Sequence, residues 1–127
     1  FFLNAVNPAN TSTVSQWGFA SGLATNGTLD VYNIMPVNCT FDAIYVSGTM
    51  LSGSGGGNVT ATLYINGTAT SLTATSTASS TLHSMGTTGS MTGQSISVTA
   101  GQVVSIGIST TNGSPTIRTN VSLHATY

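Results

Sequence analysis

Residues 59–75, VTATLYINGTATSLTAT, decide the fold class of this chain. Over 59–65, apolar residues alternate with threonine and tyrosine, which is the two-residue period of a strand with one buried face. Asn66-Gly67 follows, and this dipeptide readily adopts the two positive φ angles that a type I′ turn requires. Residues 68–75 then return as a second strand. The segment predicts an antiparallel β-hairpin.

The same alternation recurs along the chain, most clearly in residues 116–127, where apolar side chains occupy nearly every odd position from Ile117 onward. The other expected strands are residues 14–20, 29–34, 40–50, 94–99 and 102–109, the last two joined by a turn at Ala100-Gly101. Residues 51–57 are expected to be a glycine loop and 76–92 a low-complexity loop. No stretch has the helical period. About eight strands with short connections predict an all-β, two-sheet antiparallel sandwich or jelly roll.

Composition excludes several classes of function. Of 127 residues, 2% are charged, against about 25% in an ordinary soluble domain. One Arg and no Lys cannot neutralise a phosphate backbone, so nucleic acid is excluded as a partner. No apolar run reaches the roughly 20 residues of a membrane span. Because hydrophobic residues make up 39% and are patterned, the chain is a folded domain rather than a linker.

The N-terminal residues 1–13 form an extension ahead of the expected sandwich domain of residues 14–127. The extension begins with an apolar stretch and continues with a polar one. Three roles are open: a strand donated to or docked on a neighbouring subunit by β-augmentation, a local edge strand, or the remnant of a signal peptide. In the first role, the side chains expected to insert into the next subunit are Phe1, Phe2, Leu3 and Val6.

Few side chains are able to carry acid–base or ligand chemistry: Asp30, Asp42, His83, His124 and Cys39. The chain has no G-x-S-x-G elbow, no H-x-x-x-H or C-x-x-C spacing and no acidic calcium loop. We therefore expect no catalytic residue, no metal site and no cofactor, and the chain is predicted not to be an enzyme.

Three of the polar or reactive residues have structural interpretations. Cys39 is expected to be a small buried hydrophobe, with an intermolecular disulfide as the alternative. His124 lies on the polar face of the last strand and is expected to be solvated or interfacial. Arg118 shares that face, and it is a candidate to pair with Asp30 or Asp42, within one subunit or between two.

Seven of the ten asparagines begin an N-x-[ST] sequon, more than chance predicts for a chain that is about a third Ser and Thr. Asn112 is a poor acceptor because Pro115 follows its sequon closely. The remaining glycosylation candidates are Asn10, Asn26, Asn38, Asn58, Asn66 and Asn120. This excess is typical of an exported glycoprotein.

Three segments resemble charge-poor β-domains of bacterial surfaces and phages: 35–46 (MPVNCTFDAIYV), 59–75, and 95–110 (SISVTAGQVVSIGIST). The layout of residues 28–127 is similar to the BclA-type C-terminal heads of spore-surface collagen-like glycoproteins, which are tumour-necrosis-factor-like jelly rolls, and to spore-appendage subunits. The resemblance implies an exported jelly roll that assembles with copies of itself. The chain departs from the first group in having no Gly-X-Y repeat, and from the second in having no connector cysteines.

The sequence therefore predicts a non-enzymatic structural subunit of an extracellular filament or pilus-like surface appendage, on a cell, spore or virion. It would assemble with copies of itself through residues 1–13. The lack of charge favours association, because uncharged Ser/Thr-rich strands pack side by side without charge repulsion. The alternative is a trimeric fibre-tip or phage receptor-binding domain that recognises surface glycans. A phage capsid decoration protein is a third interpretation.

Overall fold

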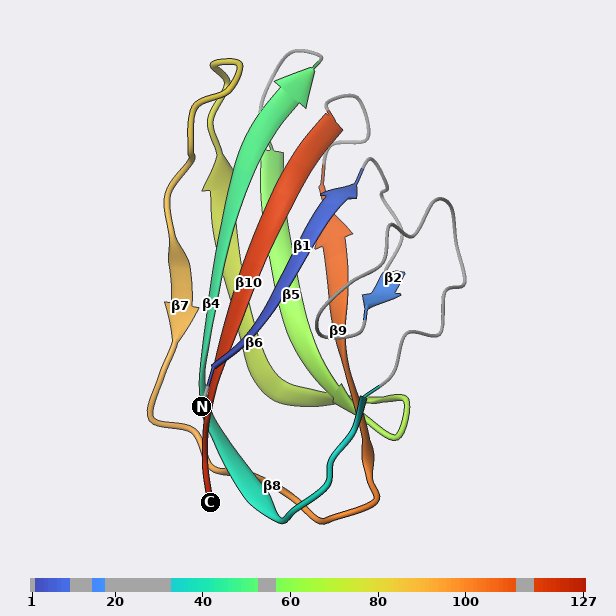
Figure 1. Ribbon diagram of the computed structural model, residues 1–127. Helices are drawn as coiled ribbons and strands as arrows, with labels where there is room; N and C mark the ends of the chain where they lie inside the picture. The colour runs from blue at the N-terminus through green and yellow to red at the C-terminus, as the bar shows by residue number, and fades with distance from the viewer. Residues whose placement is uncertain (1, 10–14, 18–32, 53–56, 112–115) are drawn as a thin grey trace.

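The computed structural model describes residues 2–9, 15–17, 33–52, 57–111 and 116–127, and the fold is all-β (Figure 1). In these residues the strands are β1 (Phe2–Ala9), β2 (Ser15–Trp17), β3 (Asn33–Ile34), β4 (Cys39–Ser52), β5 (Gly57–Ile65), β6 (Thr68–Ala78), β7 (Gly89–Met91), β8 (Ile96–Val98), β9 (Val103–Thr110) and β10 (Thr116–Thr126). Every strand pairing among them is antiparallel.

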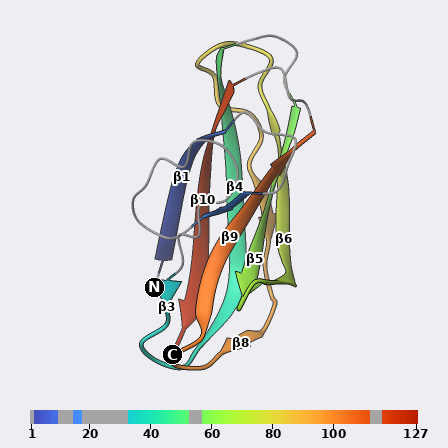
Figure 2. The same ribbon diagram turned by 90° about the vertical axis from the view of Figure 1, so that its right-hand side faces the viewer.

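The strands form two facing sheets. Sheet A has the order β1-β10-β4-β7, and β8 also pairs with β4; sheet B has the order β2-β9-β5-β6, and β3 also pairs with β9. Figure 2 shows β1, β10 and β4 in one layer and β9, β5 and β6 in the other. Because β7 and β8 pair with successive parts of β4, and β2 and β3 with successive parts of β9, the sandwich has eight strand positions within the described residues. The strand order is that of a jelly roll, so the predicted fold class is confirmed.

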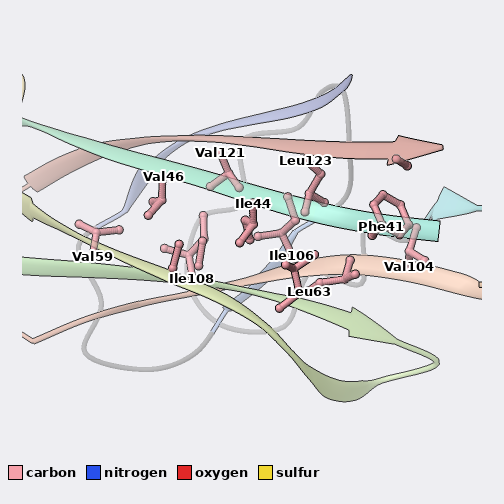
Figure 3. Packing of buried hydrophobic residues seen from close by; sticks show 14 of the residues in the cluster. Phe41, Ile44, Val46, Val59, Leu63, Val104, Ile106, Ile108, Val121 and Leu123 are labelled. Atoms are coloured by element: carbon pink, nitrogen blue, oxygen red, sulfur yellow. The ribbon is translucent and has the colours of Figure 1, made fainter. Parts of the chain in front are cut away.

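The hydrophobic core lies between the sheets (Figure 3). Sheet A contributes Phe41, Ile44, Val121 and Leu123, and sheet B contributes Leu63, Val104 and Ile106, all of them at most 1% exposed. The alternation expected in the last strand is confirmed, because its odd-numbered residues from 117 to 125 are buried and its even-numbered residues are not. Burial of these apolar side chains is the main stabilising term of the fold.

Hydroxyl pairs take the place of charges on the outer face of sheet B. The hydroxyls of Thr60 and Thr75 are 2.8 Å apart, and those of Thr62 and Thr73 are also 2.8 Å apart. These residues lie opposite each other in the register of β5 and β6. Cross-strand Thr pairs stabilise a sheet by about 0.2–1 kcal/mol each. The abundance of threonine is thus explained in part by cross-strand hydrogen bonding.

Both predicted turns are present. Asn66 and Gly67 have φ angles of 50° and 79°, as a type I′ turn requires, and they join β5 to β6. At the second turn, the Gln102 N–H donates to the Thr99 carbonyl at 3.1 Å, and Gly101 has a φ of 88°. This turn joins β8 to β9.

The expectation of a loop over residues 76–92 is wrong at both ends. β6 continues to Ala78, and β7 occupies Gly89–Met91. A Cβ on Gly89 would lie 2.0 Å from the Thr75 carbonyl oxygen, and one on Gly86 would lie 1.9 Å from the Thr77 carbonyl oxygen. Glycine at these positions lets the segment that leads into β7 pack directly on the backbone of β6. Residues 86–91 therefore lack a hydrophobic pattern because their backbone packs closely on β6, and not because they form a free loop.

Two expected strands fall largely outside the described residues. Of residues 14–20, the structure describes the part that forms β2, and of 29–34 the part that forms β3; Asp30 lies outside. In the glycine segment 51–57, residues 53–56 are likewise outside the description.

Candidate functional site

The N-terminal segment forms β1, which lies at the edge of sheet A and pairs with β10 of the same chain. The register is continuous over eight residues, from Phe2 opposite His124 to Ala9 opposite Ile117. Of the expected assembly residues, Leu3 is opposite Leu123 and Val6 is opposite Asn120, while Phe1 lies outside the described residues. Within a single chain, β1 thus takes the position of a local edge strand.

A β-bulge in β4 places Asp42 on the outer face of sheet A. In the register of β4 with β10, His124 lies opposite Ala43 and Ala125 lies opposite Phe41, so Asp42 is the extra residue. Phe41 and Ile44 are both buried although they are three residues apart, which breaks the two-residue period. Bulges of this kind redirect a side chain. Here the redirected side chain is the Asp42 carboxylate.

The Asp42 carboxylate is in hydrogen-bond contact with His124, with Oδ1 and Nδ1 2.5 Å apart. The two side chains are about one-third exposed, at 35% and 34%. Each is therefore accessible to solvent on one side and held by its partner on the other. The contact also joins β4 to β10, which are the two inner strands of sheet A.

Beside this pair lies an open pocket of about 320 Å³ on the outer face of sheet A. Its lining residues are Asp42, Ala43, Tyr45, Thr92, Gly93 and His124. They come from β4, from β10 and from the connection between β7 and β8. The Gln94 N–H donates to the Asp42 carbonyl at 3.1 Å, which ties that connection to β4. This pocket was not predicted from the sequence, in which the one available signal is the broken two-residue period around Asp42.

Arg118 is exposed on β10, opposite Thr49 of β4. It is six residues from His124 along the same strand, whereas Asp42 lies beside His124. Within the chain, Asp42 is thus partnered by His124 rather than by Arg118. An Arg118–Asp42 pair between two subunits stays a prediction.

Cys39 is 5% exposed and contributes to the core at the start of β4. Burial raises the pKa of its thiol above the ordinary value. The position agrees with the interpretation of Cys39 as a small buried hydrophobe.

The described sequon asparagines lie at the surface or part-buried. Asn38, Asn58 and Asn66 are exposed, and Asn120 is half-buried. The side-chain oxygen of Asn38 accepts a hydrogen bond from the Ala100 N–H at 2.8 Å. That of Asn58 accepts one from the Thr77 hydroxyl at 3.1 Å. Asn10 and Asn26 lie outside the described residues. A glycan is carried by the amide nitrogen, so these bonds to the amide oxygen do not occupy the atom that is modified.

His83 is exposed and has a φ of 59°. Among the described residues, no three His, Cys, Asp or Glu side chains cluster in a way that could hold a metal ion. Nor does any helix in this part of the chain have the length and hydropathy needed to cross a membrane.

Comparison with known proteins found no matching family model and no similar curated protein.

Proposed function

We propose that this chain is a structural subunit of an extracellular filament or surface appendage, and that it assembles by exchanging its N-terminal strand. The observation that supports this proposal is the continuous eight-residue register between β1 and β10 at the edge of sheet A. An identical strand from a neighbouring copy can form the same backbone hydrogen bonds with β10. Strand exchange between identical subunits therefore has a low thermodynamic cost.

The connectivity suits open-ended assembly. β1 lies at the end of the strand order of sheet A, and among the described strands it pairs with β10. If each copy gives β1 to the next and accepts β1 from the previous one, the contact is head-to-tail. Such contacts build filaments when the rotation between copies does not close a ring.

The charge composition supports close packing of many copies. The formal net charge is −1 for 127 residues, so neighbouring subunits repel each other weakly. On sheet B, paired threonine hydroxyls satisfy each other within the subunit. A surface of this kind can approach another copy without leaving buried charges unpaired.

The test is electron microscopy of the full chain beside a variant that lacks residues 1–13. We expect filaments from the full chain and monomers from the truncated chain. A synthetic peptide of residues 1–13 should bind the truncated chain at the β10 edge, whereas a scrambled peptide should not. Filaments formed by the truncated chain would overturn the proposal.

A further inference from the structure

We infer that the open pocket on the outer face of sheet A binds a neutral saccharide. This inference goes beyond filament formation and does not depend on strand exchange. It rests on the geometry of the pocket, on the polar groups that line it and on the charge distribution of the chain.

The pocket is built on paired strands and is preorganised. The bulge in β4 fixes the backbone of Asp42, and the Gln94 N–H holds the carbonyl of the same residue. Gly93, with a φ of 71°, turns the connection between β7 and β8 at the rim. Ala43 and Gly93 are small, which leaves the space open. The volume of about 320 Å³ lies at the lower end of the range for small-molecule sites, about 300–1,000 Å³.

The lining offers hydrogen-bonding groups of the kind that sugar hydroxyls need. The Asp42 carboxylate has two acceptor oxygens, and His124 is in contact with one of them. The carboxylate is thus oriented before a ligand arrives, so less side-chain entropy is lost on binding. Thr92 is exposed at the rim and supplies a hydroxyl that both donates and accepts.

Tyr45 supplies an apolar wall. Its side chain is on the outer face of β4 and is 37% exposed. Small-molecule sites combine aromatic walls with a few placed polar groups. The phenol ring of Tyr45 can stack on the C–H face of a sugar ring, while the Asp42 carboxylate and the Thr92 hydroxyl form hydrogen bonds with the O–H groups of the sugar.

Charge favours a neutral ligand over an anionic one. Asp42 is one of two carboxylates in the chain, and it lies in the pocket. The sole arginine, Arg118, lies on β10 six residues before His124, and the chain has no lysine. An anionic sugar would meet the Asp42 carboxylate, whose contact partner His124 is a cation only when it is protonated. In a polymer the site would be repeated on every subunit, so a weak single interaction would be strengthened by multivalency.

The test is saturation-transfer difference NMR with the full chain. The probes are glucose, galactose, mannose, N-acetylglucosamine and their disaccharides, with sialic acid as the anionic comparison. We expect at least one neutral sugar to bind. Asp42→Asn, which keeps the shape of the side chain, should raise the Kd for that sugar at least tenfold, and Thr92→Val should raise it several-fold.

The matched control is Thr88→Val, which makes the same change at an exposed threonine outside the pocket and should leave binding unchanged. Circular dichroism of each variant verifies the fold. Thr92→Val provides the decisive comparison if Asp42→Asn is unstable, because Thr92 is exposed on a connection. The inference is overturned if no neutral sugar binds, if sialic acid binds best, or if both pocket variants bind as the parent chain does. None of these results bears on filament formation, which is scored separately by microscopy.

Discussion

Asn66 and Val103 exchange two hydrogen bonds. The Asn66 N–H donates to the Val103 carbonyl at 2.8 Å, and the Val103 N–H donates to the Asn66 side-chain oxygen at 2.9 Å. The turn between β5 and β6 is thereby fastened to the start of β9. One residue closes the hairpin, supplies the positive φ of the turn and anchors the next strand of sheet B.

Asn66→Ala should lower the free energy of unfolding by about 2 kcal/mol. The change removes a hydrogen bond worth about 1 kcal/mol, and it replaces Asn, whose short polar side chain favours the left-handed region, by Ala, for which that region costs about 1–2 kcal/mol. Asn66→Asp is the matched control, because it keeps the acceptor and tolerates positive φ. Urea denaturation measures both. Equal stability of the two variants would contradict the assigned role of the side chain.

Gly89→Ala should destabilise the protein by about 3 kcal/mol, because the new Cβ would lie 2.0 Å from the Thr75 carbonyl oxygen. Backbone must move to relieve this contact. Ser90→Ala, at the exposed neighbouring position of β7, should be close to neutral. Thermal unfolding of the two variants checks the difference; a Gly89→Ala variant as stable as Ser90→Ala would show that the segment does not pack against β6 as described.

Thr119→Val should stabilise the protein by about 1 kcal/mol. Thr119 is fully buried, and among the described residues its hydroxyl has no hydrogen-bond partner. Replacing an unsatisfied buried hydroxyl by a methyl group removes a desolvation cost. Thr62→Val is the contrasting variant, since it breaks the 2.8 Å bond to Thr73 and should not stabilise. Chemical denaturation measures both, and a loss of stability in Thr119→Val would contradict the account.

The reaction of Cys39 with iodoacetamide should be at least tenfold slower in the native protein than in the unfolded chain. Its thiol is buried and its pKa is raised, so the thiolate is scarce at pH 8. A raised thiol pKa means that the folded state keeps its proton longer than the unfolded state. The associated stability is present below the unfolded pKa, about 8.5, and falls as the pH rises above it.

The control for this effect is Cys39→Ala, which should reduce the decline in stability between pH 7 and pH 9.5. Native reactivity equal to that of the unfolded chain would show that the thiol is accessible.

Much of the fold was predictable because it follows from local patterns. The alternation in residues 116–127 and the Asn66-Gly67 turn each specify a strand or hairpin without reference to the rest of the chain. β7 was not predictable in this way. It exists because Gly86 and Gly89 allow close packing on the backbone of β6. No hairpin turn in the sequence specifies that packing.

The pocket was hidden for a related reason. Asp42 appears in the sequence as an ordinary polar residue of a strand. The register with β10 establishes the bulge, and only the fold brings His124, Thr92 and Tyr45 beside Asp42. A break in period, between Phe41 and Ile44, is the sequence signal that such a bulge leaves.

The most direct test of strand exchange is a reversible lock on β1. Asn4 lies opposite Ser122 in the register of β1 with β10. Facing residues of antiparallel strands have Cβ atoms about 4.5–5.5 Å apart, close to what a disulfide spans. We would introduce Asn4→Cys and Ser122→Cys together in a Cys39→Ala background, oxidise the monomer and examine it by electron microscopy before and after reduction.

We expect monomers while the disulfide holds β1 in its own chain, and filaments once the disulfide is reduced. The single variants, which cannot form the intrachain lock, should assemble under reducing conditions. Filaments that form equally well with the lock closed would contradict assembly by exchange of β1.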